Sequence, residues 1–520
     1  MLQRIRRDEL DELSWEWGFS IDETEVDEYL DLAEYVLGFI DDIDDRAPAA
    51  AECLPARRNP GRRPEPSEDP FNAIVRWCNV KADLDGILSG KRIALKDSIA
   101  IAGVPMTCGS RILAGHVPEQ DAVVTERILG AGGEIVAITN MDDLAFSGGG
   151  DTSRYGPTLC PFDLGRTAGG SSSGSGAALW YDGVDVAVGG DQGGSIRVPA
   201  AWCGVVGLKP THGLVPYTGI AGIDQTFDHA GPMARTVEDA ALLLQAIAGK
   251  HESDPRQREV PATDYVRAVV EAPDDLRGFR IGLVAEGFRD GSEEERAVAG
   301  AVRDVAERLA SLGAELCEVS LPEHLQGGGI AFAGYVEGMT ALVAGGGNGH
   351  HWAGRYAPDL ASALHRGLAA HGDELPPQVK LVLVVGTHLR RRYLGAIYAK
   401  AQNLRPWLRA AHDRELADVD VLLMPTTPGL PHANEPMPIS ARVKRGWAVL
   451  ANTYPTDFTG HPALTLPLPA VDGLPAGAML IGRHFEDARL LAIARVAEGA
   501  LGRLPDPSRI AARATAPALD

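Results

Sequence analysis

The chain has 520 residues, of which 45% are hydrophobic, 23% charged and 6% aromatic, a composition typical of a globular protein with a sizeable core. Its formal net charge of −22 argues against a nucleic-acid partner, because an acidic surface repels phosphate groups. The six cysteines form no CxxC pair, and there is neither an 18-residue apolar run nor an apolar signal segment. We therefore expect a cytoplasmic protein without a membrane span, a disulfide framework or a structural zinc site.

The first 45 residues are strongly acidic, with 16 Asp or Glu residues and three Arg, a net charge of −13 that leaves −9 for the rest. After Ser20, apolar residues recur every three or four positions and predict a helix with one apolar face: Val26, Leu30, Ala33, Leu37 and Ile40. We expect this face to pack on the main body, with a dimer contact as the alternative. Residues 46–70 contain six prolines and no periodicity, which predicts a linker. We therefore divide the chain into two parts. Residues 1–68 form the acidic helices and the linker, and residues 69–520 form the main domain.

The main domain alternates between strand-like and helix-like segments. The expected strands are residues 92–102 with a polar interruption, 134–139, 184–188, 279–284 and 419–425. The expected helices are residues 121–133, 175–181 and 236–248, the last opened by a capping box from Thr236 to Asp239. Such alternation predicts an α/β fold with a substantial central sheet.

Two clusters of glycine and serine lie on either side of the strand at 184–188. The first is "GGSSSGSG", residues 169–176, and the second is "GGDQGGS", residues 189–195. Because each adjoins a helix or a strand, we interpret them as tight loops at element ends, where open α/β sheets bind ligands. Glycine lets backbone N–H groups approach a ligand closely. The clusters are therefore candidate parts of a site rather than flexible linkers.

The second cluster has the residues for an oxyanion hole. The amides of Gln192, Gly193, Gly194 and Ser195 could converge on one oxygen, with the Ser195 hydroxyl beside it. The local sequence leaves a simple strand-to-helix turn as the alternative.

A serine nucleophile needs a base. No histidine lies in this stretch, but Lys96 lies between apolar segments, where desolvation lowers the pKa of an amine. The first cluster offers hydroxyls that could support the neutral amine: Ser171, Ser172 and Ser173.

Together, Lys96, "GGSSSGSGAAL" and "GGDQGGSIRVPAAWCGVVGLKPT" resemble the amidase signature family. "TNMDDLAFSGGG" and "NTYPTDFTGHPALTLPLP" extend the resemblance, which covers roughly residues 70–500. Most members have Thr at the position of Gln192, and the Gln variant is similar to the enantioselective amidases that accompany nitrile hydratases. The resemblance implies a large mixed central sheet flanked by helices, with residues 69–520 as the catalytic domain and the acidic helices as an N-terminal appendage.

The resemblance also implies a Ser–cis-Ser–Lys triad. By motif, Ser195 is the nucleophile, Ser171 the bridging serine with a cis peptide bond to Gly170, and Lys96 the base. The implied reaction is hydrolysis of a small primary carboxamide to the acid and ammonia through an acyl-enzyme, without metal or organic cofactor. The implied assembly is a homodimer. Hydrolysis of an aryl-acylamide, ester, carbamate or hydrazide by the same triad is an alternative, as is a role within a tRNA amidotransferase, whose amidase-like subunit usually has Thr at position 192.

Several further residues have open interpretations. Phe146 and Leu450 are predicted to be pocket walls, with core packing as the alternative for each. Arg197 and Asp97 flank triad residues, and we expect them to hold the site. Ser173 replaces a glycine of the family's first cluster, which can tighten the loop or add a hydrogen bond.

Other patterns suggest different chemistry. "GSSSG", residues 170–174, matches the nucleophile elbow of α/β-hydrolases, which would make Ser172 the nucleophile with Asp457 and His461. We disfavour it because those two partners are only four residues apart. We interpret His350 and His351 as part of a polar loop and Cys203 as a small buried residue.

Overall fold

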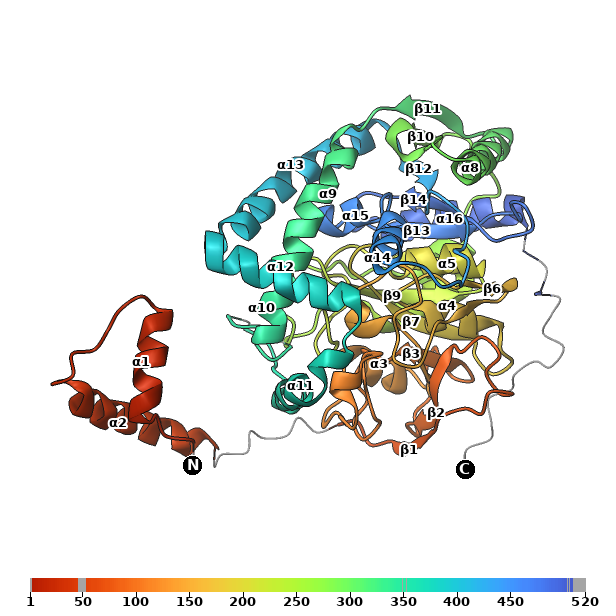
Figure 1. The fold of residues 1–520 in the computed structure, drawn as a ribbon. Helices are drawn as coiled ribbons and strands as arrows, with labels where there is room; N and C mark the ends of the chain where they lie inside the picture. Colours follow the sequence, from red (N-terminus) through yellow and green to blue (C-terminus); the bar gives the residue numbers. More distant parts are fainter. Residues whose placement is uncertain are drawn as a thin grey trace. The chain divides into compact units, whose positions relative to one another are not determined.

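The computed structural model describes residues 2–44, 53–347, 349–351, 353–502, 504 and 506–507. The chain divides into two compact units, Met1–Glu52 and Cys53–Asp520 (Figure 1). The first unit consists of α1 (Arg7–Glu16) and α2 (Val26–Asp44), the second of which is the helix expected after Ser20. Within this unit, Arg4 is 2.6 Å from a Glu34 carboxylate oxygen and 2.5 Å from one of Asp41.

The second unit contains a mixed sheet of twelve strands, which confirms the predicted α/β fold. In spatial order the strands are β1 (Arg57–Arg62), β2 (Ile74–Lys81), β4 (Glu134–Thr139), β3 (Arg92–Lys96), β7 (Val186–Asp191), β9 (His229–Ala234), β8 (Val206–Lys209), β13 (Ala463–Pro467), β14 (Gly477–Ile481), β12 (Val421–Pro425), β10 (Arg280–Val284) and β11 (Glu315–Val319). A separate pair is formed by β5 (Leu159–Cys160) and β6 (Asp163–Thr167).

Helices flank this sheet. They are α3 (Val123–Gly130), α4 (Ser173–Ala177), α5 (Arg197–Cys203), α6 (Val237–Ile247), α7 (Tyr265–Val270), α8 (Glu293–Ser311), α9 (Glu323–Ala333), α10 (Met339–Ala344), α11 (Pro358–His371), α12 (Pro377–Tyr393), α13 (Ala396–Asp418), α14 (Ile439–Ala448), α15 (Tyr454–Thr459) and α16 (Asp487–Leu501). Figure 1 shows α9, α11, α12 and α13 together on one side of the sheet. The expected Thr236 cap opens α6, where its side chain accepts a hydrogen bond from Asp239 N. None of the described helices has the length and apolarity that a bilayer crossing requires.

The sheet topology places the two Gly/Ser clusters near Lys96. Strands β3 and β7 are parallel neighbours, with Leu95 paired to Val188. Their carboxyl ends therefore meet at one edge of the sheet. Lys96 is the last residue of β3, and the second cluster begins with the last three residues of β7, so residues about 95 positions apart in the sequence lie side by side. The structure thus corrects the interpretation of this cluster as a loop throughout, because Gly189–Asp191 belong to the strand.

The structure corrects two further sequence expectations. The segment predicted as a linker, residues 46–70, contributes β1, which pairs antiparallel with β2 at the edge of the sheet; residues 45–52 lie outside the described part. An edge strand tolerates Pro60 because one side of its backbone needs no partner strand. The strand expected at 92–102 ends at Lys96, and beyond it Ile99 makes only an isolated bridge with Ile220.

Candidate active site

Lys96 lies buried at the end of β3 and its amine faces both Gly/Ser clusters. Its Nζ is 2.8 Å from Ser171 Oγ and donates a hydrogen bond of 3.3 Å to the carbonyl of Gly190. Burial lowers the pKa of Lys96 to about 8, although the carboxylates of Asp191 and Asp142 act in the opposite direction. About a tenth of this amine is therefore neutral at pH 7, and a neutral amine can accept the proton of the serine that it contacts.

The first cluster is anchored by Asp142, which sequence reasoning did not single out. Its carboxylate accepts hydrogen bonds of 2.9 Å from the amides of Gly150, Asp151 and Thr152, and its own amide donates to Ser171 O at 3.2 Å. The peptide bond between Gly170 and Ser171 is cis, as the resemblance implies. A Cβ at Gly170 would lie 1.9 Å from Asp142 Oδ2, so only glycine fits there. Burial raises the pKa of Asp142 to about 6, although the amide hydrogen bonds oppose this.

Ser172 joins the two clusters rather than acting as a nucleophile elbow. Its hydroxyl donates to the carbonyl of Gly190 at 3.0 Å and accepts from the amide of Gly190 at 3.1 Å. Its amide donates to Ser195 O at 3.0 Å, which places the two clusters side by side. Ser173, the departure from the family pattern, has its Oγ 3.4 Å from the carbonyl of Asn140. The extra hydroxyl therefore contacts the backbone of Asn140.

Asp191, the last residue of β7, closes the second cluster into a compact loop. Its carboxylate accepts from Gly194 N at 2.6 Å and from Ile196 N at 3.0 Å, and Arg197 Nε donates to it at 3.0 Å. From the sequence, the Gly194 amide was expected to be one of the oxyanion-hole donors. The structure corrects this expectation, because the Gly194 N–H already donates a hydrogen bond to Asp191. Burial alone would raise the pKa of Asp191, but the Arg197 guanidinium lowers it well below its ordinary value.

The other amides of this loop remain available. In the described part of the chain, no hydrogen-bond acceptor is found for the N–H groups of Gln192, Gly193 and Ser195. The carbonyls point the other way: Gln192 O accepts from Tyr335 Oη at 3.0 Å, and Gly193 O accepts from Thr453 Oγ1 at 2.5 Å. The first contact orients the peptide group between Gln192 and Gly193 so that the Gly193 N–H is left for an incoming oxygen. The second contact fixes the next peptide group, whose N–H is the Gly194 amide that binds Asp191.

Both glycines of the loop are required by space. A Cβ at Gly193 would lie 2.3 Å from the Tyr335 hydroxyl, and one at Gly194 would lie 2.1 Å from Thr453 Oγ1. The side chain of Gln192 is buried; its Nε2 donates to the Tyr217 hydroxyl at 2.9 Å. Its Oε1 has no hydrogen-bond partner among the described residues.

Arg197 and Asp97 hold the site, each through buried contacts. Arg197 pairs with Asp191 and, at 2.8 Å, with Asp457 Oδ2. Asp97 accepts hydrogen bonds from Thr107 N at 3.0 Å and Gly109 N at 3.1 Å, which fixes the chain directly after Lys96. Because Asp457 pairs with Arg197, it does not form the α/β-hydrolase triad that the "GSSSG" pattern suggests. His461 contacts Asp413 instead, at 3.0 Å.

An apolar pocket opens beside Ser195. Its walls include Phe146 and Leu450, the two residues predicted to line it, together with Tyr335 and Trp447. Phe146 meets Tyr335 edge to face, with ring centroids 6.1 Å apart. None of the twelve residues that line this pocket is Asp, Glu, Lys or Arg.

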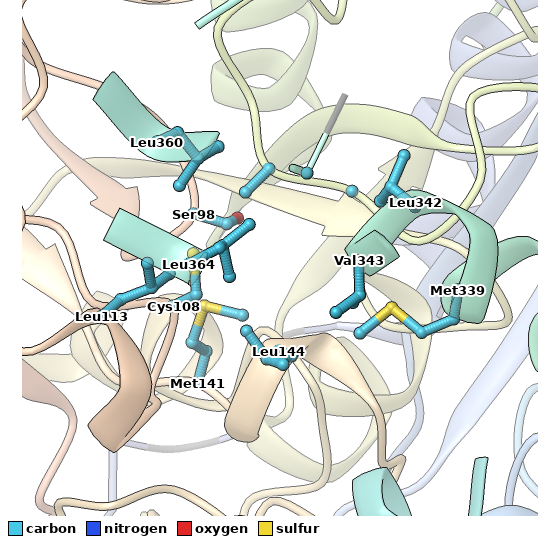
Figure 2. Close-up of a pocket in the computed structure, with 13 residues that line it drawn as sticks. Ser98, Cys108, Leu113, Met141, Leu144, Met339, Leu342, Val343, Leu360 and Leu364 are labelled. Atoms are coloured by element: carbon cyan, nitrogen blue, oxygen red, sulfur yellow. The ribbon is translucent and has the colours of Figure 1, made fainter. Parts of the chain in front are cut away.

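A second apolar pocket adjoins the first across the turn that carries Phe146. Figure 2 shows its side chains, among them Met141, Leu144, Met339 and Leu364, pointing into a common space. Leu144 and Ala145 have positive φ angles of 48° and 63°, an uncommon conformation that reverses the chain between the two pockets. Leu144 lines the second pocket and Ala145 the first, so this turn forms part of the wall of both.

The remaining sequence candidates lie elsewhere. His350 and His351 line a wider cleft together with residues such as Asp224 and Tyr398, and Ser195 is not among its lining residues. Cys203 is buried with its Sγ 3.6 Å from the carbonyl of Ala168. Sequence reasoning missed Tyr335 and Thr453, which hold the Ser195 loop from positions more than 130 residues away. No local pattern marks Tyr335, whereas Thr453 lies in the "NTYPTDFTGHPALTLPLP" segment, whose resemblance to the family could have drawn attention to it.

Comparisons with known proteins agree with the motifs. The sequence profile of the family named Amidase matches residues 78–491. An enantioselective amidase from Rhodococcus rhodochrous is 40% identical over 458 residues, which cover 86% of this chain and 87% of that protein. A solved subunit of the glutamyl-tRNA(Gln) amidotransferase from Thermotoga maritima has a TM-score of 0.68 at 29% identity, covering 85% of this chain and 91% of that one. A peptide amidase from Stenotrophomonas maltophilia has a TM-score of 0.65 at 30% identity, covering 81% and 85%.

Proposed function

The chain belongs to the amidase family and is an amidohydrolase, and we propose that it hydrolyses small primary carboxamides to the carboxylic acid and ammonia through an acyl-enzyme. The observation that carries this proposal is the contact of 2.8 Å between Lys96 Nζ and Ser171 Oγ, in a buried site beside the Ser195 loop. Lys96 is the base, Ser171 the bridging serine and Ser195 the nucleophile.

Protons move along this relay in both half-reactions. Neutral Lys96 accepts the proton of Ser171 while Ser171 accepts that of Ser195, whose Oγ attacks the amide carbon. As the tetrahedral intermediate collapses, Ser171 passes its proton to the leaving nitrogen and regains one from the Lys96 ammonium, so that ammonia departs and Lys96 is neutral again. Water then attacks the acyl-enzyme, losing its proton to the same relay, and the acid is released from Ser195. Side chains of the protein supply every proton transfer in these steps.

The negative oxygen of each tetrahedral intermediate binds to the amides of Gln192, Gly193 and Ser195. The absence of acceptors for these N–H groups in the described part of the chain supports this assignment, as does the contact of the Gln192 carbonyl with Tyr335, which orients the Gly193 amide. One donor of this kind is worth about 3–4 kcal/mol in transition-state stabilisation. Because the loop is held by Asp191, the donors are in place before the substrate binds.

The lining of the pocket supports a small uncharged acyl group. Phe146 and Leu450 form its walls beside Ser195, and its lining contains no charged residue. The acyl group of glutamine carries an ammonium and a carboxylate, which would be buried here without partners at high cost. The pocket therefore favours simple carboxamides over the glutamine-dependent role that similarity to part of an amidotransferase suggests.

We also propose a homodimer in which the N-terminal helices supply contacts. The unit's own helices leave large apolar side chains uncovered, among them Trp17, Tyr35 and Phe39. Contiguous exposed apolar surface is typical of an interaction site. Sedimentation of the full chain should give a dimer, and Tyr35→Glu with Phe39→Glu should shift it to the monomer. A monomeric wild-type protein would contradict this assignment. A cytoplasmic location stays a prediction.

The proposed reaction is tested by ammonia release at pH 7.5 from a panel of aliphatic and aromatic primary amides, with glutamine included. Ser195→Ala is the blank, and Ser311→Ala, an exposed serine on α8, is the matched control. We expect release from the simple amides by the wild type and the control, and none above background by Ser195→Ala. Equal release by Ser195→Ala, or release from glutamine alone, would refute the proposal.

A further inference from the structure

Two histidines and an aspartate from three different segments converge on one point. Asp413 lies on α13, His461 between α15 and β13, and His484 between β14 and α16. One nitrogen or oxygen from each lies within 4.8 Å of the other two. Asp413 Oδ1 is 3.0 Å from His461 Nε2 and 3.7 Å from His484 Nδ1. None of the three belongs to the loops or the pocket that contain Ser195.

The hydrogen bonds of His484 identify which of its nitrogens is free. Its Nε2 is 3.0 Å from the carbonyl of Thr459, and because a carbonyl only accepts, this nitrogen carries a proton. In the neutral ring the lone pair is therefore on Nδ1, which lies 3.7 Å from Asp413 Oδ1. A cation at this point would bind both His484 Nδ1 and Asp413 Oδ1.

His461 is held in a similar way. Its Nδ1 is 2.9 Å from Thr459 Oγ1, which can accept the ring proton and leave Nε2 as the second nitrogen ligand. Thr459 thus supplies an outer hydrogen-bond partner to both rings, an arrangement that orients metal-binding histidines. The distances of 3.0 and 3.7 Å bracket the roughly 3.3 Å between ligand atoms in a tetrahedral zinc site with bonds of about 2.0–2.1 Å. The Asp413 side chain is 53% exposed, which leaves a path for the ion and a position for water.

We propose that Asp413, His461 and His484 bind one divalent transition-metal ion, with Zn²⁺ as the candidate. Two imidazoles and one carboxylate suit zinc and its neighbours, whereas Mg²⁺ and Ca²⁺ prefer sites of oxygen ligands. Because the ligands come from three segments, the bound ion would join these segments and stabilise the folded state. The expectation of no structural zinc site rested on cysteine spacing, and this cluster contains no cysteine.

The test uses the untagged full-length protein, stripped of metal with a chelator and dialysed. Zn²⁺ is titrated in competition with a chromogenic chelator, and the melting temperature is recorded with and without the ion. We expect one Zn²⁺ per chain and a higher melting temperature on binding. Asp413→Asn changes an exposed side chain and should weaken binding at least about tenfold. Asp418→Asn, an exposed aspartate on the same helix, should bind as the wild type does.

A second variant leaves the three ligands intact. Arg409 lies one turn before Asp413 on α13, and its positive charge opposes a cation at the site, so Arg409→Ala should tighten binding. His371→Gln removes a histidine paired with Glu374 at 2.9 Å elsewhere, and it should change nothing. The proposal is overturned if the wild type takes up no stoichiometric Zn²⁺, if Asp413→Asn binds as tightly, or if His371→Gln removes the binding.

Discussion

Arg197 Nε lies 3.0 Å from Asp191 Oδ2, and both side chains are fully buried. The Asp191 carboxylate also accepts hydrogen bonds from the amides of Gly194 and Ile196, so it fixes the backbone on both sides of Ser195. Arg197 is held in turn by Asp457, on a segment 260 residues further along the chain. The ion pair therefore connects the position of Ser195 to the packing of the C-terminal half of the sheet.

Asp191→Asn should reduce both stability and activity. It leaves the buried Arg197 with one carboxylate instead of two, and breaking a buried ion pair costs about 3–5 kcal/mol. Urea unfolding measures the loss of stability. Ammonia release measures the loss of activity that we expect when the Ser195 loop is no longer fixed. Glu271→Gln breaks an exposed pair with Arg267 and should change the stability far less, because water screens exposed charges. Equal losses in the two variants would contradict a structural role for the buried pair.

Lys96→Arg should lose activity while the fold is retained. Arginine keeps the positive charge but cannot give up its proton in a protein, so it cannot act as the base. A positioned general base accelerates a reaction by about 10²–10⁴-fold, so kcat/KM of this variant should fall by that factor. Lys400→Arg, an exposed lysine on α13, is the control and should keep full activity. Substantial turnover by Lys96→Arg would show that another group takes the proton.

The pH dependence of kcat/KM should follow the pKa of Lys96, which is lowered to about 8. Only the neutral amine acts as a base, so the rate should rise about tenfold per pH unit below pH 8 and level off above it. Lys209 also has a pKa lowered to about 8. The pH profile of the residual activity of Lys96→Arg distinguishes the titration of Lys96 from that of Lys209, because only Lys209 is present in this variant. An unchanged inflection near pH 8 in that variant would assign the profile to a group other than Lys96.

Gly170→Ala should abolish activity through a steric clash. The added Cβ would lie 1.9 Å from Asp142 Oδ2, an oxygen that is fixed by the amide of Gly150. The Ser171 loop must shift, and a displacement of about 1 Å costs on the order of 10²-fold in rate. Gly300→Ala on α8 meets no atom within 4 Å and should instead stabilise the protein by about 0.5–1 kcal/mol. Full activity in Gly170→Ala would mean that the loop tolerates movement.

The regular alternation of strands and helices could be predicted from the sequence, because periodicity and capping are local signals. Strand β4 and helix α6 follow closely from them, whereas β7 continues through Gly189–Asp191, which were interpreted as part of a loop. The edge strand β1 could not be predicted, since its residues Arg57–Arg62 are polar and contain a proline, and only pairing with β2 makes them a strand. The order of the twelve strands depends on pairings between distant segments that no local pattern encodes.

The candidate site shows the same division. Lys96, Ser171 and Ser195 stand in motifs, so the sequence identifies them. The role of the Gly194 amide could not be read from composition, because a glycine amide gives no sign that Asp191 will bind it. Tyr335 lies in a π-helical turn, Gly334–Gly338, far from the motifs, and its contact with Gln192 exists only in the folded chain.

The central claim is that Ser195 is the nucleophile, and covalent labelling tests it most directly. A fluorophosphonate reacts with an activated serine hydroxyl, which displaces fluoride and forms a phosphorus–oxygen bond. A protease that cleaves before aspartate separates residues 163–181, with the first serine cluster, from residues 191–223, in which Ser195 is the single serine. The position of the label is then read by mass spectrometry.

We expect one label per chain on the peptide of residues 191–223, and almost none in Lys96→Arg, where the hydroxyl is not activated. The same treatment of Ser195→Ala should leave both peptides unlabelled. A label on residues 163–181 in the wild type would contradict the assignment of Ser195 and would identify a serine of the first cluster as the nucleophile instead.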